Sequence, residues 1–227
     1  MVIVGWDDSY SKDNFNTDLE GDGAFICQNS WGDNFGENGF FYISYYDTNI
    51  GTHNVVYTDI ENTDNYDHIY QSDLCGWVGQ LGYNKDSIYS ANVFTAEGNE
   101  NLKAASFYAT GKDSQYELYV VRQFEDETSL EKMIPVASGK LGNAGYYTVD
   151  FNQGIEVDAG ERYAVVLYII TPGSVHPMAI EYAADEATEN VDLDDGESYI
   201  SANGSKWVSV DTVEKSNLCI KAFSDNR

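Results

Sequence analysis

The sequence predicts an all-β protein. Short segments rich in Val, Ile, Tyr and Phe recur along its 227 residues, turn signals separate them, and helical periodicity is nearly absent. The clearest predicted strands are 89–95, 104–109, 116–121, 146–151, 163–170, 178–182 and 219–223. Gly- or Pro-containing turns such as 110–113, 142–145 and 171–173 lie between them. This spacing is typical of a sandwich or barrel, and we expect a jelly-roll-like β-sandwich.

The remaining elements are weaker. Segments 2–6, 24–28 and 40–45 are apolar or alternating and are predicted as further strands. Residues 127–133 are the one helical candidate, and a short one. The 18 tyrosines fit half-buried strands and need no ligand to explain them.

Composition excludes some partners. Lys and Arg number 12 against 38 Asp and Glu, which gives a formal charge of -26. Such a charge repels phosphate backbones and anionic lipid, so we expect no nucleic-acid partner. The longest apolar run, 163–170, is too short to cross a bilayer, so we expect no membrane insertion. No cofactor is indicated.

Three cysteines, Cys27, Cys75 and Cys219, do not form a disulfide framework. Cys75 and Cys219 could pair if the fold brought them together, but an odd number leaves one thiol over. We expect all three to be free. Cys27 lies in an apolar segment that offers neither a helix N-terminus nor a cation to lower its pKa, so a buried structural thiol is expected.

The most specific motif is Asn29-Ser30-Trp31-Gly32, which follows the apolar segment 24–28 and precedes the turn 36–39 and the strand 40–45. This strand-turn-strand pattern resembles the asparagine segment of papain-like cysteine peptidases. The resemblance implies that Asn29 accepts a hydrogen bond from the catalytic histidine and that Trp31 shields that bond from water. The alternative is that Asn29 caps a tight turn and Trp31 is an ordinary core aromatic.

The rest of the catalytic apparatus is not recognised in the sequence. Aligned on Gly5, the family's histidine falls about two positions before Met1, and its nucleophilic cysteine lies more than a hundred residues further upstream, as the family layout implies. We therefore expect Met1 to be an internal methionine of a longer reading frame. His53, His68 and His176 all follow Asn29, against the family order, and are predicted to be surface or loop residues. The chain alone is predicted to be inactive.

A domain boundary is predicted in the polar segment 59–65. From about Tyr66, segments 67–71, 91–96, 102–108, 145–150 and 219–223 resemble the lectin-like domain that follows the peptidase in some bacterial surface proteins. We therefore expect a remnant of the papain-like β-barrel half at 1–61 and a lectin-like β-sandwich at 62–227.

Sugar-binding candidates in the second domain are Trp77, Tyr83 and Trp207, because an exposed aromatic ring can stack on a pyranose. Core packing is the competing interpretation for each of them. The acidic run 192–197 invites a calcium site, but it departs from the EF-hand pattern at Gly196, and a solvated loop is favoured. No metal site is therefore predicted. Asn203-Gly204-Ser205 fits a glycosylation sequon, which a bacterial source would leave bare.

Together these patterns predict the C-terminal part of a secreted or cell-surface papain-like cysteine endopeptidase, whose partner is a peptide or protein substrate. The location is inferred from the resemblance alone. The alternative is a noncatalytic module that binds a glycan or a protein on a cell surface.

Overall fold

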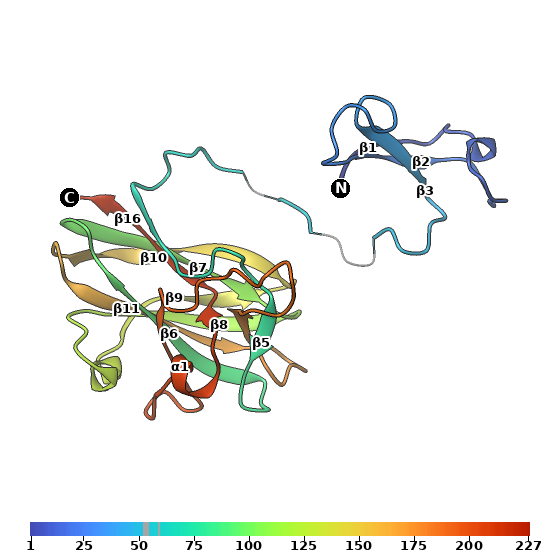
Figure 1. Ribbon diagram of the computed structural model, residues 1–227. Coiled ribbons are helices and arrows are strands. Elements are labelled where there is room, and N and C mark those ends of the chain that lie inside the picture. Colours follow the sequence, from blue (N-terminus) through green and yellow to red (C-terminus); the bar gives the residue numbers. More distant parts are fainter. Residues whose placement is uncertain (52–54, 59) are drawn as a thin grey trace. The chain divides into compact units, whose positions relative to one another are not determined.

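The computed structural model describes residues 1–51, 55–58 and 60–227, without the side chains of residues 211 and 212. The chain divides into two compact units, Met1–Ile60 (unit 1) and Glu61–Arg227 (unit 2), which Figure 1 shows with the connecting segment. His53 lies outside the described residues.

Unit 1 is built on a three-stranded antiparallel sheet in the order β1-β2-β3. Its elements are β1 (Val2–Asp7), the 3₁₀ helix η1 (Lys12–Asn14), β2 (Ala24–Gln28) and β3 (Phe40–Ser44). The three predicted strands are thus confirmed. The loop before β2 folds back so that the ring of Tyr10 stacks on Tyr42 of β3 at 4.1 Å.

Unit 2 is almost entirely β. Its strands are β4 (His68–Tyr70), β5 (Gly79–Leu81), β6 (Ser87–Thr95), β7 (Glu100–Ala109), β8 (Ser114–Val121), β9 (Ile134–Leu141), β10 (Gly145–Val157), β11 (Arg162–Ile170), β12 (Met178–Glu181), β13 (Glu197–Ser201), β14 (Val208–Ser209), β15 (Asn217–Leu218) and β16 (Ile220–Asn226). The 3₁₀ helix η2 (Glu127–Glu131) and the one-turn helix α1 (Val210–Val213) complete the unit. Among the described helices, none is long and apolar enough to span a membrane.

The strands of unit 2 form a sandwich. A four-stranded sheet, β10-β7-β16-β4, faces a six-stranded sheet, β14-β13-β6-β11-β8-β9, and a small sheet, β15-β12-β5, completes the fold (Figure 1). The pairs in these sheets are antiparallel. The prediction of an all-β protein with a sandwich in this part is confirmed.

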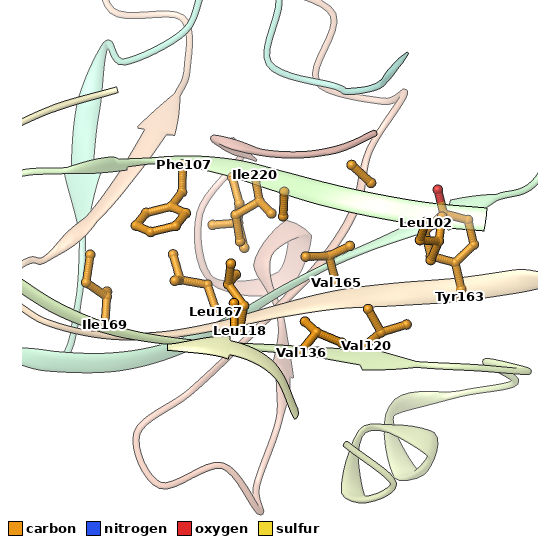
Figure 2. Close-up of a cluster of buried hydrophobic side chains, with 14 of the residues drawn as sticks. Leu102, Phe107, Leu118, Val120, Val136, Tyr163, Val165, Leu167, Ile169 and Ile220 are labelled. Carbon is orange, nitrogen blue, oxygen red and sulfur yellow. The ribbon is translucent and has the colours of Figure 1, made fainter. Parts of the chain in front are cut away.

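The main core lies between the two large sheets. Figure 2 shows side chains of β7 and β16 pointing toward those of β8, β9 and β11. The fully buried members with the largest side chains are Ile88, Leu102, Phe107, Leu118, Tyr163, Leu167, Ile169, Met178, Leu218 and Ile220. They lie in segments rich in β-branched, aromatic and other apolar residues, which is the composition that predicted these strands.

The six-stranded sheet is also covered on part of its outer face. Phe124 and Leu130, from the segment that contains η2, pack with Ala164 and Val166 of β11, and Trp207 packs against the same cluster. The segment is fixed by a cap, because Asp126 accepts a hydrogen bond from the Thr128 amide at 2.9 Å. The helix predicted at 127–133 is therefore present as a 3₁₀ helix, shorter than expected.

Buried Asn92 joins different sheets, and buried Glu100 joins three strands of the four-stranded sheet. The Asn92 amide on β6 donates to the carbonyls of Leu218 and Ile220 at 3.0 and 2.9 Å, and its oxygen accepts from Ser198 at 2.7 Å. Glu100 on β7 accepts from the Tyr70 hydroxyl at 2.7 Å and from Ser224 on β16. The side chains of Asn92 and Glu100 thus both have hydrogen-bond partners, which offset the cost of their burial.

Several strands escape prediction because they are short or carry breakers. β4, β5, β14 and β15 have two or three residues and leave no periodic signal. β9 contains Pro135, which is tolerated because β9 is an edge strand and its register shifts at that point. β13 begins at Glu197, so the last residue of the predicted acidic loop is a strand residue.

We expect Leu118→Ala to lower the free energy of unfolding by about 2 to 5 kcal/mol, because it leaves a cavity in the middle of the sandwich. Guanidinium denaturation followed by tryptophan fluorescence measures the change. Leu74→Ala is the matched control, since the Leu74 side chain is 75% exposed and its loss should cost within about 0.5 kcal/mol. Equal effects of the two substitutions would contradict the assigned core.

Acid should weaken unit 2 through Glu100. Burial alone would raise the pKa of Glu100, but hydrogen bonds from Ser224, Tyr70 and the Gly98 amide hold it below its usual range. Because the folded pKa is depressed, this stabilisation is present above the unfolded pKa near 4.5 and is lost as the pH falls through the folded value.

Glu100→Gln should therefore cost about 1.5 to 3 kcal/mol at pH 7 and progressively less toward pH 3. Urea denaturation of both proteins across this range measures the difference. Glu131→Gln, at an exposed position of η2, is the control and should change little. A cost of Glu100→Gln that is constant from pH 7 to pH 3 would show that the carboxylate charge is not involved.

Candidate functional site

Asn29 stands at the end of β2, in a loop that its own side chain helps to fix. Both its main-chain N and its Nδ2 donate to the carbonyl of Gly39 at 3.1 Å, and its Oδ1 accepts from the Trp31 amide. The bond to the Trp31 amide closes a turn, as the alternative interpretation of Asn29 requires, while the orienting role of Asn29 stays a prediction. A carbonyl oxygen has two lone pairs, so Oδ1 retains capacity for a second donor.

The loop that carries Asn29 depends on glycine. Gly36 has φ of +58°, and a Cβ there would lie 2.1 Å from the carbonyl oxygen of Phe40. Gly39, the acceptor for Asn29, has φ of +89°. A side chain at either position would displace the loop, so the two glycines fix where Asn29 lies.

Trp31 is not a core residue of unit 1. Its side chain is 74% exposed, and its ring touches Phe35 edge-on at 4.9 Å, which in turn meets Phe41 at 5.7 Å. The alternative that Trp31 is an ordinary core aromatic is therefore wrong for this unit. The role of Trp31 as a shield over an Asn29 hydrogen bond stays a prediction.

Much of β1 is uncovered in unit 1. Its exposed large apolar side chains are Val2, Ile3, Val4 and Trp6, and Met1 just before the strand is exposed as well. This is an unusual amount of apolar surface for one strand of a soluble protein. The face of unit 1 that carries β1 therefore lacks a cover within the unit.

The thiol nearest to Asn29 in the sequence is inert. Cys27 is fully buried on β2, and burial raises the pKa of its thiol, with only a small opposing effect from the N-terminal charge. A nucleophilic cysteine needs the opposite shift. The prediction of a buried structural thiol is confirmed, as is the prediction that all three cysteines are free.

Of the sugar-binding candidates in unit 2, Trp77 is the most open. Its side chain is 37% exposed, and its ring lies 5.8 Å from that of Tyr108. Tyr83 packs against the main core, and burial raises the pKa of its hydroxyl. Trp207 packs against the outer cluster, where its Nε1 is buried without a partner among the described residues. Among the described contacts, none joins two of these three side chains, so they do not form one site.

The histidines of unit 2 do not form a catalytic pair with a cysteine. His176 lies in a loop, as predicted. His68 is a strand residue of β4 rather than a loop residue, and its ring contacts Asn226 at 3.0 Å and Glu97 at 3.6 Å. The hydrogen bond to Asn226, opposed by burial, raises the pKa of His68.

The acidic run 192–197 is only partly solvated. The backbone carbonyl of Asp192 and the carboxylate of Asp195 approach Asn217 Nδ2 at 2.8 and 3.2 Å, together with the Ser72 carbonyl and Glu181. Within the described residues no group of three or more His, Cys, Asp or Glu is placed to hold a metal ion. The expectation that no metal binds here stays a prediction.

A groove that the sequence did not predict crosses the outer face of the six-stranded sheet. Its volume is about 250 Å³, and it lies over β8, β9 and the end of β11. It is lined by Gln115, Glu117, Ser138, Lys140, Tyr168 and Ile170, with Tyr116 and Gly139 between them. In the sequence of β8, polar Gln115 and Glu117 alternate with Tyr116 and Leu118. This alternation indicates an outward-facing row of polar side chains but not a groove.

Comparison with known families agrees with this description. Residues 69–224 match the family described as "Lectin like domain", and residues 1–60 match "Papain family cysteine protease". The chain belongs to the lectin-like domain family, and a papain-family cysteine protease segment precedes that domain. The two resemblances expected from the sequence are confirmed.

Two solved structures are similar to the chain. The clostridial cysteine protease Cwp84 after propeptide cleavage is 28% identical, with a TM-score of 0.80 over 98% of this chain and 56% of its own. The cysteine protease and lectin-like domains of Cwp84, a surface layer associated protein of Clostridium difficile, are 25% identical, with a TM-score of 0.74 over 98% of this chain and 50% of that one. The chain therefore spans about half of each. No curated protein matches it significantly.

We expect one of the three thiols to react readily with Ellman's reagent in the native protein, because Cys75 is exposed while Cys27 and Cys219 are buried. Burial also raises the pKa of both buried thiols, which keeps them protonated at pH 8. Absorbance at neutral to mildly alkaline pH counts the reactive thiols. Cys75→Ser should abolish the rapid reaction, and guanidinium should release the remaining two. Rapid labelling of Cys27 in the folded Cys75→Ser protein would disprove the assignment.

Proposed function

We propose that unit 1 supplies the orienting asparagine of a papain-like cysteine endopeptidase whose nucleophile and base lie outside this sequence. The observation that carries the proposal is Asn29 itself, held at a glycine-fixed position by two bonds to Gly39 with an exposed indole beside it. The papain-family match over residues 1–60 and the similarity to Cwp84 support it.

In such an enzyme the histidine takes the proton of the cysteine thiol, and the thiolate attacks the carbonyl carbon of the scissile bond. The amine leaves with that proton, and water then hydrolyses the thioester. Asn29 Oδ1 would accept from the second ring nitrogen of the histidine, holding one tautomer and stabilising the imidazolium. Trp31 would exclude water that competes for this bond. Asn29 is thus a positioning residue.

The uncovered strand β1 is consistent with this role. In the family, a papain-like barrel half packs against the other half of the peptidase domain. Burying a few hundred Å² of the surface formed by Val2, Val4 and Trp6 would gain several kcal/mol at about 25 cal/mol per Å². The same surface that lacks a cover in unit 1 is therefore a docking face for the rest of the peptidase.

The 227-residue chain alone should hydrolyse no dipeptidyl fluorogenic substrate, because orientation without nucleophile and base generates no thiolate. Sequencing the DNA before the Met1 codon should reveal an in-frame histidine about two codons upstream and a Gln-Gly-x-Cys-like segment earlier. Turnover by the purified chain that a thiol-alkylating reagent blocks would overturn the proposal, and Cys27→Ala would then be the variant to examine.

In the longer protein, Asn29→Ala should lower kcat by about 10²-fold, the usual scale for positioned acid–base chemistry. The alkaline limb of the pH–rate profile should also move to lower pH, because the imidazolium loses its acceptor and its pKa falls. Trp6→Ala, on β1, is the control for a structural effect and should leave the limb in place. An unshifted profile in Asn29→Ala would contradict the orienting role.

A second candidate function belongs to unit 2. A noncatalytic module that binds a glycan or a protein at a cell surface fits the lectin-like family and the half-open Trp77. The similarity to a surface layer associated protein supports a cell-surface location for the whole protein. Saturable binding by the chain to bacterial cell walls would favour this module, whereas its absence would favour a structural role for unit 2.

A further inference from the structure

The groove over β8, β9 and β11 joins residues that the strand register places on one surface. Tyr168 pairs with Glu117, and Glu117 pairs with Ser138. Two residues further along β11, Ile170 pairs with Gln115, and Gln115 pairs with Lys140. Directly paired residues point to the same face of a sheet, so these side chains form two parallel rows.

These rows lie on the outer face, away from the core. The neighbours Leu118, Leu167 and Ile169 point inward and are fully buried, so the alternate positions must point outward. The cover formed by the η2 segment and Trp207 packs around Ala164 and Val166. The two rows lie further along β11, where they line the groove instead.

Tyr168 presents an aromatic wall to this groove. On one side its ring stacks on Tyr89 of β6, with centroids 4.2 Å apart and planes at 21°. The groove lies toward β8 and β9, on the side of β11 opposite to β6. The ring is therefore braced from behind by Tyr89 and turns its other face to the groove. Tyrosine combines an apolar face with a polar tip, which suits amphipathic ligands.

The polar side chains opposite Tyr168 are available to a ligand. Among the described residues, the side chains of Gln115, Ser138 and Lys140 form no hydrogen bond or ion pair with the protein. Glu117 accepts one bond from the Tyr119 hydroxyl and has acceptor capacity left. The groove thus offers an amide, a hydroxyl, a carboxylate and an ammonium group beside one aromatic face.

We propose that this groove, which we name the Tyr168 groove, binds a neutral pyranose glycan. The C–H face of a sugar ring would pack on Tyr168, and its hydroxyls, which both donate and accept, would bond to Gln115, Glu117, Ser138 and Lys140. The lone charges of Glu117 and Lys140 balance each other, while the chain carries a net charge of -26. That charge disfavours anionic glycans.

The inference deepens the binding-module role proposed for unit 2, and it names a different place from Trp77. It does not depend on the peptidase role of unit 1.

The test is calorimetric titration of the 227-residue chain with cellohexaose, maltohexaose and N-acetylchitohexaose, and with hexagalacturonate as the anionic comparison. At least one neutral hexasaccharide should bind saturably. Tyr168→Ala should weaken it by about tenfold or more, whereas Tyr168→Phe, which keeps the ring, should stay within about twofold of the parent. Tyr146→Ala, at an exposed aromatic of β10 in the other large sheet, is the matched control and should bind normally, whereas Trp77→Ala tests the rival position.

Ser138→Trp provides a second variant, because it fills the groove from an exposed position without altering the core. It should abolish binding while leaving the thermal unfolding midpoint unchanged. The proposal can then be tested even if Tyr168→Ala fails to fold. No binding of any neutral hexasaccharide, or binding of hexagalacturonate alone, would overturn the proposal. Loss of binding in Trp77→Ala but not in Ser138→Trp would place the glycan elsewhere and leave only the module role.

Discussion

Burial of the six-stranded sheet on both faces is the constraint on which unit 2 depends. β11 contributes Tyr163, Val165, Leu167 and Ile169 to one face and Ala164 and Val166 to the other. An antiparallel sheet usually needs a cover on one side only. Here the four-stranded sheet covers the first face, and the long connection from β8 to β9, with its 3₁₀ helix, covers part of the second.

The outer cover has a functional consequence because it is partial. It shelters the small residues Ala91 and Ala164, where segments from outside the sheet can approach closely. Further along β11 the sheet carries Tyr168 and Ile170 and opens into the groove. Ala164 under the cover and Tyr168 in the groove therefore lie on the same strand, β11, and one strand register fixes both positions.

In unit 1, by contrast, the Asn29 loop is held by local contacts, while the apolar face of β1 is uncovered. The Asn29 loop is fixed by its own glycines and by bonds to Gly39, all within about ten residues of chain. No nearby segment of unit 1 covers the apolar side chains of β1, because one short sheet cannot bury its own outer face. An asparagine held by local bonds on a unit with an open apolar face is the arrangement expected if, as we propose, a catalytic site is assembled across two halves of a domain.

The sequence by itself determined the long strands, because apolar segments rich in β-branched and aromatic residues, such as 163–170, favour buried strands, and it located Asn29, because the motif is contiguous. It missed the shortest strands, which carry too few residues for a period, and it placed Glu197 in a loop although the residue begins β13. Only the tertiary structure decided that Trp31 is exposed and Tyr83 packed on the core. The groove also required the structure, since Gln115, Ser138 and Tyr168 become neighbours through strand pairing, and pairing depends on contacts between residues far apart in the chain.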